Sequence, residues 1–487
     1  MKKGFRLFAL ALFGAGLVHA QDTWTFSSST DTITHPLGWV LAVEVNDHEL
    51  TVTECLAAPD GDVLPLADPV DDGYTIVSLY SPYWEWYSGL LAGFEGAATS
   101  LTLPDTLVTI GDCAFDSYPG FTGPLVIPNS VKTIGWYAFI DCGFTGPLTL
   151  GSSLEIIGGG AFEWCSGFTG PLVIPDSVTY IGGGAFDGCS GFTGSLVIPD
   201  SVTEIGDGAF AWCSGFTGSL VIPDSVTYIE GWTFGGCSGF DETLTISSSV
   251  KAIGHNAFSL CGFTGSLVIP DSVTYIGGWA FDVCTGFDGT LTIGNSVTEI
   301  GNFAFAVNGF TEVRTPSTGV TFGEGVFLAM HYLTAVYYSG AHPDDVGDNF
   351  YTSDWEDSPL VVSYVTAANA HLWDDYVTTA GGGKFSEVGE GMWQDKPIRI
   401  YVPTPPTPQG VRVDTIAVDA SGDVTLTWAA VTGTVTVHAT SDLSNPFPGP
   451  DWKLFPGNAA GATLTRTELE SQGLPTNKLF FRVTAVE

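Results

Sequence analysis

Leu-Val-Ile-Pro-Asp-Ser-Val-Thr-Glu-Ile-Gly-Asp-Gly-Ala-Phe-Ala-Trp-Cys-Ser-Gly-Phe, residues 196–216, is one copy of a phrase that occurs nine times between residues 101 and 309. Its isoleucine recurs every 24 residues, with two steps of 23, at Ile110, Ile134, Ile157, Ile181, Ile205, Ile229, Ile253, Ile276 and Ile300. Both short steps lack the serine that normally follows the cysteine, so the apolar positions stay in register. A period in this range with fixed apolar positions predicts a solenoid.

One coil follows from the order of apolar and turn residues in this phrase. In residues 196–198 the leucine and isoleucine point to one side of a strand and the valine to the other. Pro199 ends the strand because it cannot donate to a ladder. Val202 and Ile205 then return inward, and residues 209–213 are expected to form one helical or 3₁₀ turn before Phe216 closes the coil. The sequence therefore predicts a strand-rich α/β solenoid with short helical turns.

The same residues resemble a known repeat. Ile-Pro-Asp-Ser-Val-Thr-x-Ile-Gly-x-x-Ala-Phe-x-x-Cys is similar to the BspA-type (treponemal) leucine-rich repeat of bacterial surface proteins, strongly over residues 101–310 and more loosely over 40–340. The resemblance implies a right-handed leucine-rich-repeat solenoid and, in several members, adhesion to host or neighbouring-cell proteins. It implies no catalytic residues. No wall-sorting motif or C-terminal membrane anchor accompanies the repeats, so covalent surface attachment is not expected.

The chain outside the repeats divides into segments of different composition. Lys2 and Lys3 precede an apolar run that ends in Val-His-Ala, which is typical of a secretory signal peptide. Residues 424–428, 434–438 and 479–484 alternate at period two, as in a small β-sandwich, with a weak similarity to fibronectin-III-like modules. We expect a signal peptide at 1–20, an N-terminal cap with a degenerate first coil at 22–100, a leucine-rich-repeat solenoid at 101–340, a C-terminal cap at 341–402, a proline-rich linker at 403–408 and an all-β sandwich at 409–487.

Charge excludes several classes of partner. The net charge is −39, and between Leu101 and Phe310 the only lysines or arginines are Lys132 and Lys251. A nucleic acid or an anionic lipid surface would be repelled. The apolar run near the N-terminus is too short to remain as an anchor, so no membrane insertion is expected after signal cleavage.

Seven of the nine cysteines occupy one position of the repeat, three residues after its phenylalanine. Stacked coils would bring neighbouring cysteines within bridging distance, but with parallel Cβ vectors that strain a disulfide. A buried thiol is also a good small apolar side chain. We expect a ladder of thiols and leave open whether some rungs are bridged. The seven are Cys142, Cys165, Cys189, Cys213, Cys237, Cys261 and Cys284.

Motifs for catalysis, metal binding and cofactor binding are not found in the sequence. It contains no Gly-x-Ser-x-Gly, His-Glu-x-x-His, phosphate loop or dinucleotide fingerprint. Aspartates line up at Asp176, Asp200, Asp224 and Asp271, but each belongs to the same Pro-Asp-Ser turn, where other copies carry asparagine. We predict no enzyme, no cofactor and no metal site.

What remains is surface. The outward strand position forms a β-branched stripe that includes Val173, Val197 and Val221 and carries no charge; strand propensity alone could explain it. Aromatic residues break the repeat beside it, at Tyr180, Tyr228, Tyr275, Trp232 and Trp279, and such side chains are typical interface anchors. We therefore predict a secreted or surface-exposed, non-enzymatic protein. Its solenoid is expected to use a concave face to bind an extracellular protein, in adhesion or protein–protein interaction. The alternatives are an extracellular glycan-binding or matrix scaffold protein and, third, a polysaccharide-active enzyme; the oligomeric state stays open.

Overall fold

The computed structural model describes residues 23–400 with gaps at 59–61, 67–69, 71–73, 81–88, 92–97, 318, 340–361, 367–369, 375–376, 378, 380–383, 385–389 and 394–395. Beyond residue 400 it describes only the strands. The expected signal peptide, the aromatic residues at 83–87 and the proline-rich linker lie outside the described residues. The chain separates into two compact units, Met1–Ile400 and Tyr401–Glu487, which are treated in turn.

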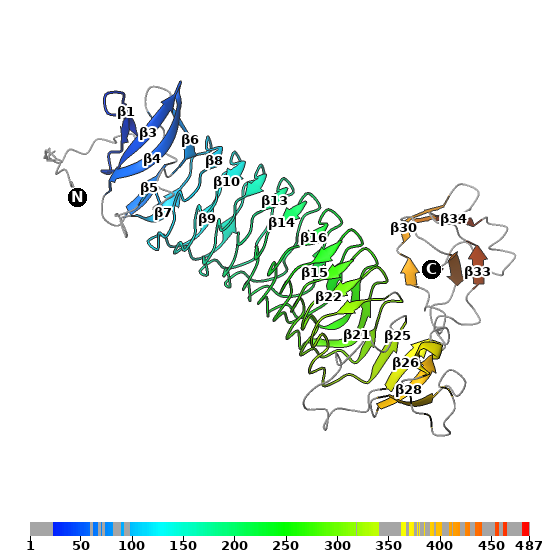
Figure 1. Ribbon diagram of the computed structural model, residues 1–487. Helices are drawn as coiled ribbons and strands as arrows, with labels where there is room; N and C mark the ends of the chain where they lie inside the picture. Colours follow the sequence, from blue (N-terminus) through cyan, green and yellow to red (C-terminus); the bar gives the residue numbers. More distant parts are fainter. Residues whose placement is uncertain are drawn as a thin grey trace. The chain divides into compact units, whose positions relative to one another are not determined.

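The first unit contains a stack of coils, most of which hold two short parallel strands on different sides of the coil (Figure 1). In two coils a single parallel bridge between Val173 and Val197 takes the place of the first strand. We call the Leu-Val-Ile strands the first-strand row and those that end at the anchor isoleucine the second-strand row. The first-strand row comprises β5 (Asp62–Pro65), β7 (Ala98–Thr102), β9 (Leu125–Val126), β11 (Leu148–Thr149), β15 (Leu220–Ile222), β17 (Leu244–Ile246), β19 (Gly265–Ile269), β21 (Phe287–Ile293), β23 (Glu312–Arg314), β25 (Ala335–Tyr338) and β26 (Val362–Thr366). The solenoid expected from the period is confirmed.

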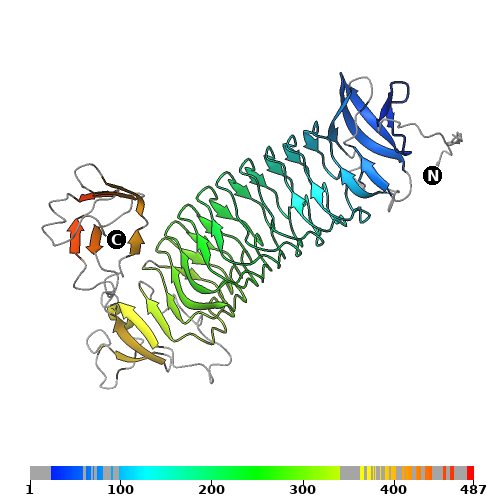
Figure 2. The same cartoon turned by 180° about the vertical axis from the view of Figure 1, so that it is seen from behind.

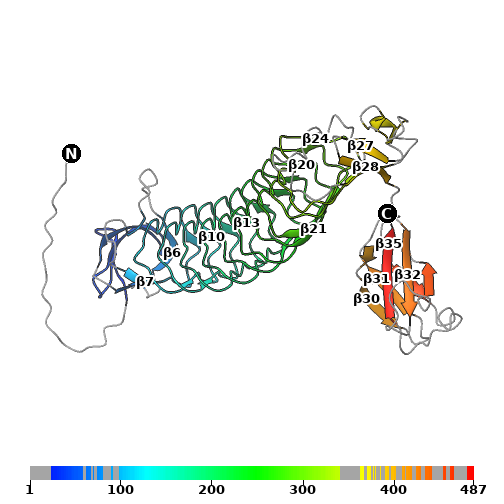
Figure 3. The same ribbon diagram turned by 90° about the horizontal axis from the view of Figure 1, so that it is seen from below.

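The second-strand row keeps the anchor isoleucines in register, because Ile110 lies opposite Ile134, which lies opposite Ile157. Figure 2 shows the same coils from behind, and Figure 3 shows them from below. The row comprises β6 (Thr75–Leu79), β8 (Thr109–Ile110), β10 (Thr133–Ile134), β12 (Ile156–Ile157), β13 (Tyr180–Ile181), β14 (Glu204–Ile205), β16 (Tyr228–Ile229), β18 (Ala252–Ile253), β20 (Tyr275–Ile276), β22 (Glu299–Ile300) and β24 (Thr321–Phe322). Within the described coils it forms two sheets, one ending at β14 and the next starting at β16.

An antiparallel meander closes the N-terminal end of the stack. Its strands are β1 (Thr25–Ser27), β2 (Thr32–Thr34), β3 (Val40–Asn46) and β4 (Glu49–Ala57). β4 then pairs in parallel with β6, so the meander continues directly into the second-strand row. Trp24 and Trp39 are fully buried in this cap, and the indole Nε1 of Trp24 donates to the carbonyl of Pro65. The meander thereby covers apolar side chains that the first coil would otherwise expose.

At the other end, the first-strand row continues beyond the last clear repeat. β23 pairs with β25 and β25 with β26, all in parallel, and β28 (Lys396–Tyr401) then pairs antiparallel with β27 (Glu390–Trp393). A 3₁₀ helix, η4 (Ala370–Trp373), lies between β26 and β27 in the chain. The change from parallel to antiparallel pairing ends the repeat.

Two ladders of phenylalanine rings run through the core. Phe139, Phe162 and Phe186 belong to a ladder that continues through every coil to Phe327, with neighbouring ring centroids 5.1–5.9 Å apart. A second ladder runs from Phe121 to Phe310 at 4.6–6.3 Å. Nearly all of these rings are fully buried. Because each ring packs on its counterpart in the next coil, no coil completes its core alone.

The cysteines form the predicted ladder of thiols. All nine cysteines are buried and free, so no rung is bridged. Each of the seven repeat cysteines donates its S–H to the phenylalanine carbonyl of the preceding coil at 2.9–3.1 Å, as Cys213 does to Phe186. Asn308 occupies the next position of the ladder, and its Nδ2 donates to the carbonyl of Phe281 at 2.8 Å. From Cys142 to Asn308 the ladder position therefore carries a hydrogen-bond donor on a small side chain.

The segment after each anchor isoleucine differs from the expectation of a helical turn. It forms successive hydrogen-bonded turns, such as Ala209 N to Gly206 O and Ala211 N to Gly208 O, and no helix. Alternate amides instead donate to the next coil, as Phe210 N does to Thr233 O at 2.9 Å. A helix would direct these amides along its own axis. Pairing between coils satisfies them and keeps the solenoid strand-like on this side too.

The second unit contains two antiparallel sheets. One has four strands, β29 (Gln409–Val411), β35 (Phe480–Val486), β32 (Thr434–Thr440) and β33 (Lys453–Pro456). The other has three, β30 (Val413–Val418), β31 (Val424–Trp428) and β34 (Gly461–Leu464). This arrangement agrees with the small all-β C-terminal sandwich expected from the period-two alternation.

Candidate functional site

The outward valines of the coils are among the most exposed apolar side chains of the regular repeats. Val173 and Val197 are 67% and 68% exposed, whereas the leucine and isoleucine on either side of each are buried. Val221 and Val268 follow at 56%. Strand alternation causes this contrast, because successive side chains point to opposite faces. We call Val126, Val173, Val197, Val221 and Val268, with the threonines between them, the valine stripe.

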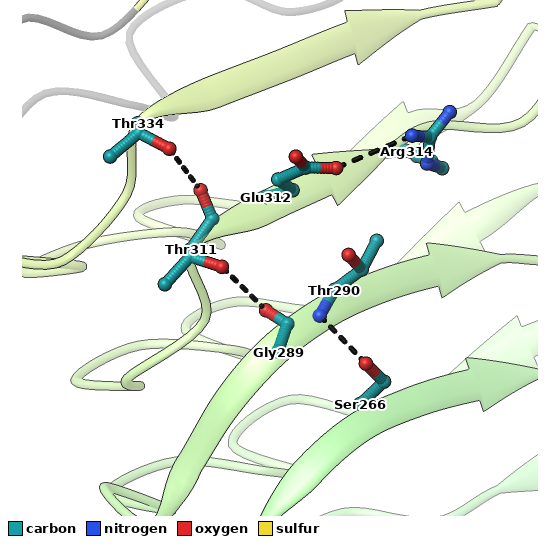
Figure 4. Close-up of polar contacts among 7 residues, drawn as sticks. All are labelled: Ser266, Gly289, Thr290, Thr311, Glu312, Arg314 and Thr334. Atoms are coloured by element: carbon teal, nitrogen blue, oxygen red, sulfur yellow. Dashed lines mark hydrogen bonds and ion pairs between the residues drawn. The ribbon is translucent and has the colours of Figure 1, made fainter.

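The valine stripe ends at a charged and aromatic group. Arg314 lies opposite Thr292 in the register, and its guanidinium is 3.3 Å from the carboxylate of Glu312 (Figure 4). The guanidinium also lies 4.2 Å from the ring centroid of Tyr337, which stacks on Tyr364 at 4.8 Å. Figure 4 also shows threonines whose hydroxyls donate to the preceding coil. An uncharged surface therefore meets an ion pair where the regular repeats end.

The tyrosines predicted as anchors lie in the other sheet. Tyr180, Tyr228 and Tyr275 occupy β13, β16 and β20 of the second-strand row, directly before the anchor isoleucine. Tyr228 is 56% exposed, Tyr275 is 39% exposed and Tyr180 is half-buried. Glutamates Glu204 and Glu299 take the same position in other coils. The structure thus places these tyrosines and the valine stripe on two different sheets of the coil.

Trp232 and Trp279 lie on neither sheet but in the turns that follow the second strand. Each coil has two residues with left-handed backbone there, three and seven positions after the anchor. Several coils place glycine at these positions, for example Gly184 and Gly188. Other coils place a large aromatic residue there, although a left-handed backbone costs a residue with a Cβ about 1–2 kcal/mol. We call these aromatic residues the aromatic ridge: Tyr137, Trp164, Trp212, Trp232, Trp279 and Phe303.

The sequence interpretation included only two residues of this ridge among its candidate site residues. Trp164 and Trp212 are 54% and 46% exposed, more than Trp279 at 36%, and nearby Trp136 is 62% exposed. The predicted aromatic residues lie one position before or three positions after the anchor isoleucine, whereas Trp164 and Trp212 lie seven positions after it. The available signal was the position seven residues after the anchor, where glycine and tryptophan replace one another between coils.

The ridge residues pack on neighbouring coils. The Trp212 and Trp232 rings stack at 6.3 Å, and Trp279 stacks on Phe303 at 5.6 Å. Trp164 covers a glycine of the next coil, since a Cβ added to Gly188 would lie 2.8 Å from its ring. One face of such a ring therefore rests on backbone while about half of the side chain stays accessible.

Carboxylates stand between the exposed rings. Glu163 accepts a hydrogen bond from Trp164 Nε1 at 3.0 Å. In the next coil, burial and the charge of Glu163 raise the pKa of Asp187 to about 6, while burial raises the pKa of Glu163. Burial also raises the pKa of Asp282, three residues after Trp279. The surroundings of the ridge are therefore acidic.

The hydrogen-bond ladder is interrupted beside the ridge. Glycine follows the anchor in most coils, and a Cβ added to Gly206 would lie 2.3 Å from the Gly183 nitrogen. Glu230 occupies this position in its coil. In the fully described stretch 203–230, neither Thr227 N nor Glu230 N donates to the preceding coil, whereas Gly206 N donates to Ile181 O. The added Cβ thus explains why β14 and β16 belong to separate sheets.

One of the turn aspartates has a structural partner. Asp271 Oδ1 accepts from Asn295 N, and Asn129 Oδ1 accepts from Ser152 N at 2.9 Å, so aspartate and asparagine do the same work in this turn. Among the described side chains, no group of three or more metal-ligating residues lies together. The described segments also include no helix with the length and apolarity needed to cross a bilayer.

Comparison with known proteins identifies the repeat. The family described as BspA type leucine-rich repeat region (6 copies) matches residues 94–217 and 207–334. No curated protein sequence matches the chain significantly.

Solved structures with similarity to this chain are bacterial repeat proteins. A leucine-rich repeat protein from Bacteroides ovatus shares 19% identity over 64% of this chain and 97% of its own, with a TM-score of 0.35. The pneumococcal vaccine antigen PcpA shares 16% identity over 77% of this chain and 99% of its own, with a TM-score of 0.37. A leucine-rich cell surface protein from Faecalibacterium prausnitzii shares 19% identity over 69% of this chain and 89% of its own, with a TM-score of 0.31. By the family match and its own coil geometry, residues 94–334 of this chain are a BspA-type leucine-rich repeat region.

Proposed function

We propose that the protein is exported and acts at the cell surface or outside the cell as a non-enzymatic binding protein, whose solenoid holds another protein in adhesion or protein–protein interaction. The observation that carries the proposal is the valine stripe. Five valines that are 56–68% exposed repeat at the outward position of the coils, and no charged residue occupies that position from Thr102 to Thr292, before Arg314. The BspA-type repeat adds to this, since members of that family are surface proteins.

The size of the stripe suits a specific interface. Adjacent strands lie about 4.8 Å apart, so the stripe from Val126 to Val268, which spans seven coils, is about 30 Å long. A stable protein–protein interface needs about 800 Å² from each partner. Exposed apolar side chains along such a row supply area whose burial is favourable.

The test is a charge scan with a matched control. The mature chain, residues 21–487, is screened against arrays of extracellular proteins and glycans, and each hit is measured again with Val173→Lys, Val197→Lys and Val221→Lys combined. The control combines Thr179→Lys, Thr203→Lys and Thr227→Lys, exposed positions where other coils carry Lys132 and Lys251. Both variants add three positive charges.

We expect the valine variant to lose binding to a protein partner and the threonine variant to keep it, with similar melting temperatures for both. Equal binding by the two variants would show that the valine stripe is only a scaffold. Hits confined to glycans would replace the protein-binding assignment with the glycan-binding alternative.

A further inference from the structure

The aromatic ridge is more than a packing device. Trp164, Trp212, Trp232 and Trp279 adopt φ values of 54–61° at turn positions that other coils fill with glycine. A coil with glycine there stacks equally well, as Gly184 and Gly188 show. The left-handed backbone recurs in every coil, also at Leu260, Val283 and Val307, so the fold requires this backbone but does not require a large aromatic side chain there. The exposed tryptophans therefore call for a role outside the core.

The charge beside the ridge decides what could lie on it. The carboxylates of Glu163, Asp187 and Asp282 stand in the same turns as the rings. Over residues 133–310 the only lysine or arginine is Lys251. Aromatic faces attract ammonium and guanidinium groups, most strongly at tryptophan, and neighbouring carboxylates add to that attraction. An anionic ligand would meet the opposite field.

We propose that the aromatic ridge binds a basic, extended segment of a protein partner, with lysine or arginine side chains lying over the faces of Trp164 and Trp212 and pairing with Glu163 and Asp187. This inference rests on the proposed protein-binding function and adds the chemistry of the partner and a second contact surface. Trp164 Nε1 already donates to Glu163, which fixes the ring and the carboxylate side by side.

The spacing of the rings sets the spacing of the cations. Trp164 and Trp212 occupy the same turn position two coils apart, with Gly188 between them. Two coils correspond to about 10 Å. A segment in the polyproline-II conformation advances about 3.1 Å per residue with three residues per turn, so side chains three residues apart lie on one face about 9 Å apart. A segment with a basic residue at every third position would place one cation on each ring.

A synthetic peptide tests the inference on the full mature chain. The probe has twelve residues with lysine at every third position and glycine or serine between; one control peptide replaces lysine with glutamate, and a neutral β-linked glucan oligosaccharide is a second control. The ridge variant combines Trp164→Leu and Trp212→Leu, because Leu260 occupies this turn position naturally. The protein control combines Tyr228→Thr and Tyr275→Thr, because Thr133 and Thr321 occupy that strand position.

We expect the lysine peptide to quench tryptophan fluorescence and to bind more weakly as salt rises. The ridge variant should lose about fivefold to thirtyfold in affinity, and the tyrosine variant should keep it. Failure of the lysine peptide to bind, or unchanged binding by the ridge variant, would overturn the inference, as would ridge-dependent binding of the glucan. If a partner found through the valine stripe binds the ridge variant normally, protein binding stands and only the ridge assignment fails.

Discussion

The repeat cysteines serve as hydrogen-bond donors inside the core. Each thiol ends at a phenylalanine carbonyl of the preceding coil, and Asn308 makes the same contact with an amide. The side chain must therefore be small, largely apolar and able to donate one hydrogen bond. Cysteine satisfies all three conditions, and the absence of bridges among these cysteines leaves every thiol free to donate.

Substitutions at Cys213 should separate these conditions. Cys213→Ser keeps a donor and should be tolerated best, whereas Cys213→Ala leaves the Phe186 carbonyl with only its bond from Cys189 N and should cost about 0.5–1.5 kcal/mol of unfolding free energy. Cys213→Asp buries a charge without a partner and should cost about 4 kcal/mol or more. Chemical denaturation of the mature chain measures the series, and wild-type protein with added reductant is the control. A smaller loss for alanine than for serine would contradict the donor role.

Alkaline pH should destabilise the protein through the same thiols. Burial raises the pKa of Cys165, Cys237 and Cys284 from 9.0 to about 12. A raised pKa in the folded state contributes stability that is fully present below pH 9 and is lost as pH rises toward 12, because the unfolded thiol ionises first. Each thiol should lower the free energy of unfolding by about 1.4 kcal/mol for each pH unit between 9 and 12. Melting temperatures between pH 7 and 11 measure it, and Cys213→Ser, with one thiol fewer, should show a shallower decline.

Among the strands and turns, the glycine after each anchor isoleucine controls how closely two coils approach. Where glycine is present, an added Cβ would clash with backbone atoms of the preceding coil; at Gly206 it would lie 2.3 Å from the Gly183 nitrogen. Where Glu230 replaces it, the second-strand row divides into two sheets. The turns on the far side remain paired across this point, as Phe210 N to Thr233 O shows, so the two coils stay hydrogen-bonded there.

Exchanging the two residue types should move the interruption. Glu230→Gly should allow the backbone amides of residues 227 and 230 to donate to the preceding coil. The free energy of unfolding should rise by about 1 kcal/mol, because two hydrogen bonds outweigh the entropy cost of glycine. Gly206→Glu should introduce a second interruption and lower stability by a similar or larger amount. Hydrogen exchange of amides 203–230 together with thermal melting provides the measurement. Unchanged protection of these amides in Glu230→Gly would refute the explanation.

The sequence predicts the coil better than it predicts the site, for a physical reason. Core positions such as Ile205 and Phe210 repeat because every coil must pack against an identical neighbour, so periodicity reveals them. The helical turn expected at 209–213 was wrong, because local propensity could not show that these amides pair with the next coil. Trp164 and Trp212 were missed because hydrophobic periodicity does not reveal a left-handed backbone, which is marked only by the replacement of glycine by tryptophan seven residues after the anchor.

For the chain as a whole, the two compact units suggest a division of labour. The described solenoid carries the valine stripe and the aromatic ridge, both on surfaces built by many coils. We predict that a protein partner binds residues 21–400 as tightly as the mature chain and does not bind residues 401–487. Circular dichroism of each fragment first checks that it folds, and titration calorimetry then compares affinities. Binding by the fragment 401–487 alone would contradict the prediction and assign partner binding to the C-terminal unit.

The interchangeable coils have a further consequence, which concerns reach. Because a coil meets its two neighbours through the same residues, as the Phe186–Phe210 and Phe210–Phe234 stacks show at 5.4 and 5.6 Å, one more copy could be inserted without a new kind of contact. Each inserted 24-residue unit would lengthen the stack by about 4.8 Å. In a gene made of near-identical units, unequal recombination supplies such insertions and deletions directly. Insertion or deletion of whole repeats can therefore change the length of the solenoid while the segments at its two ends stay unchanged.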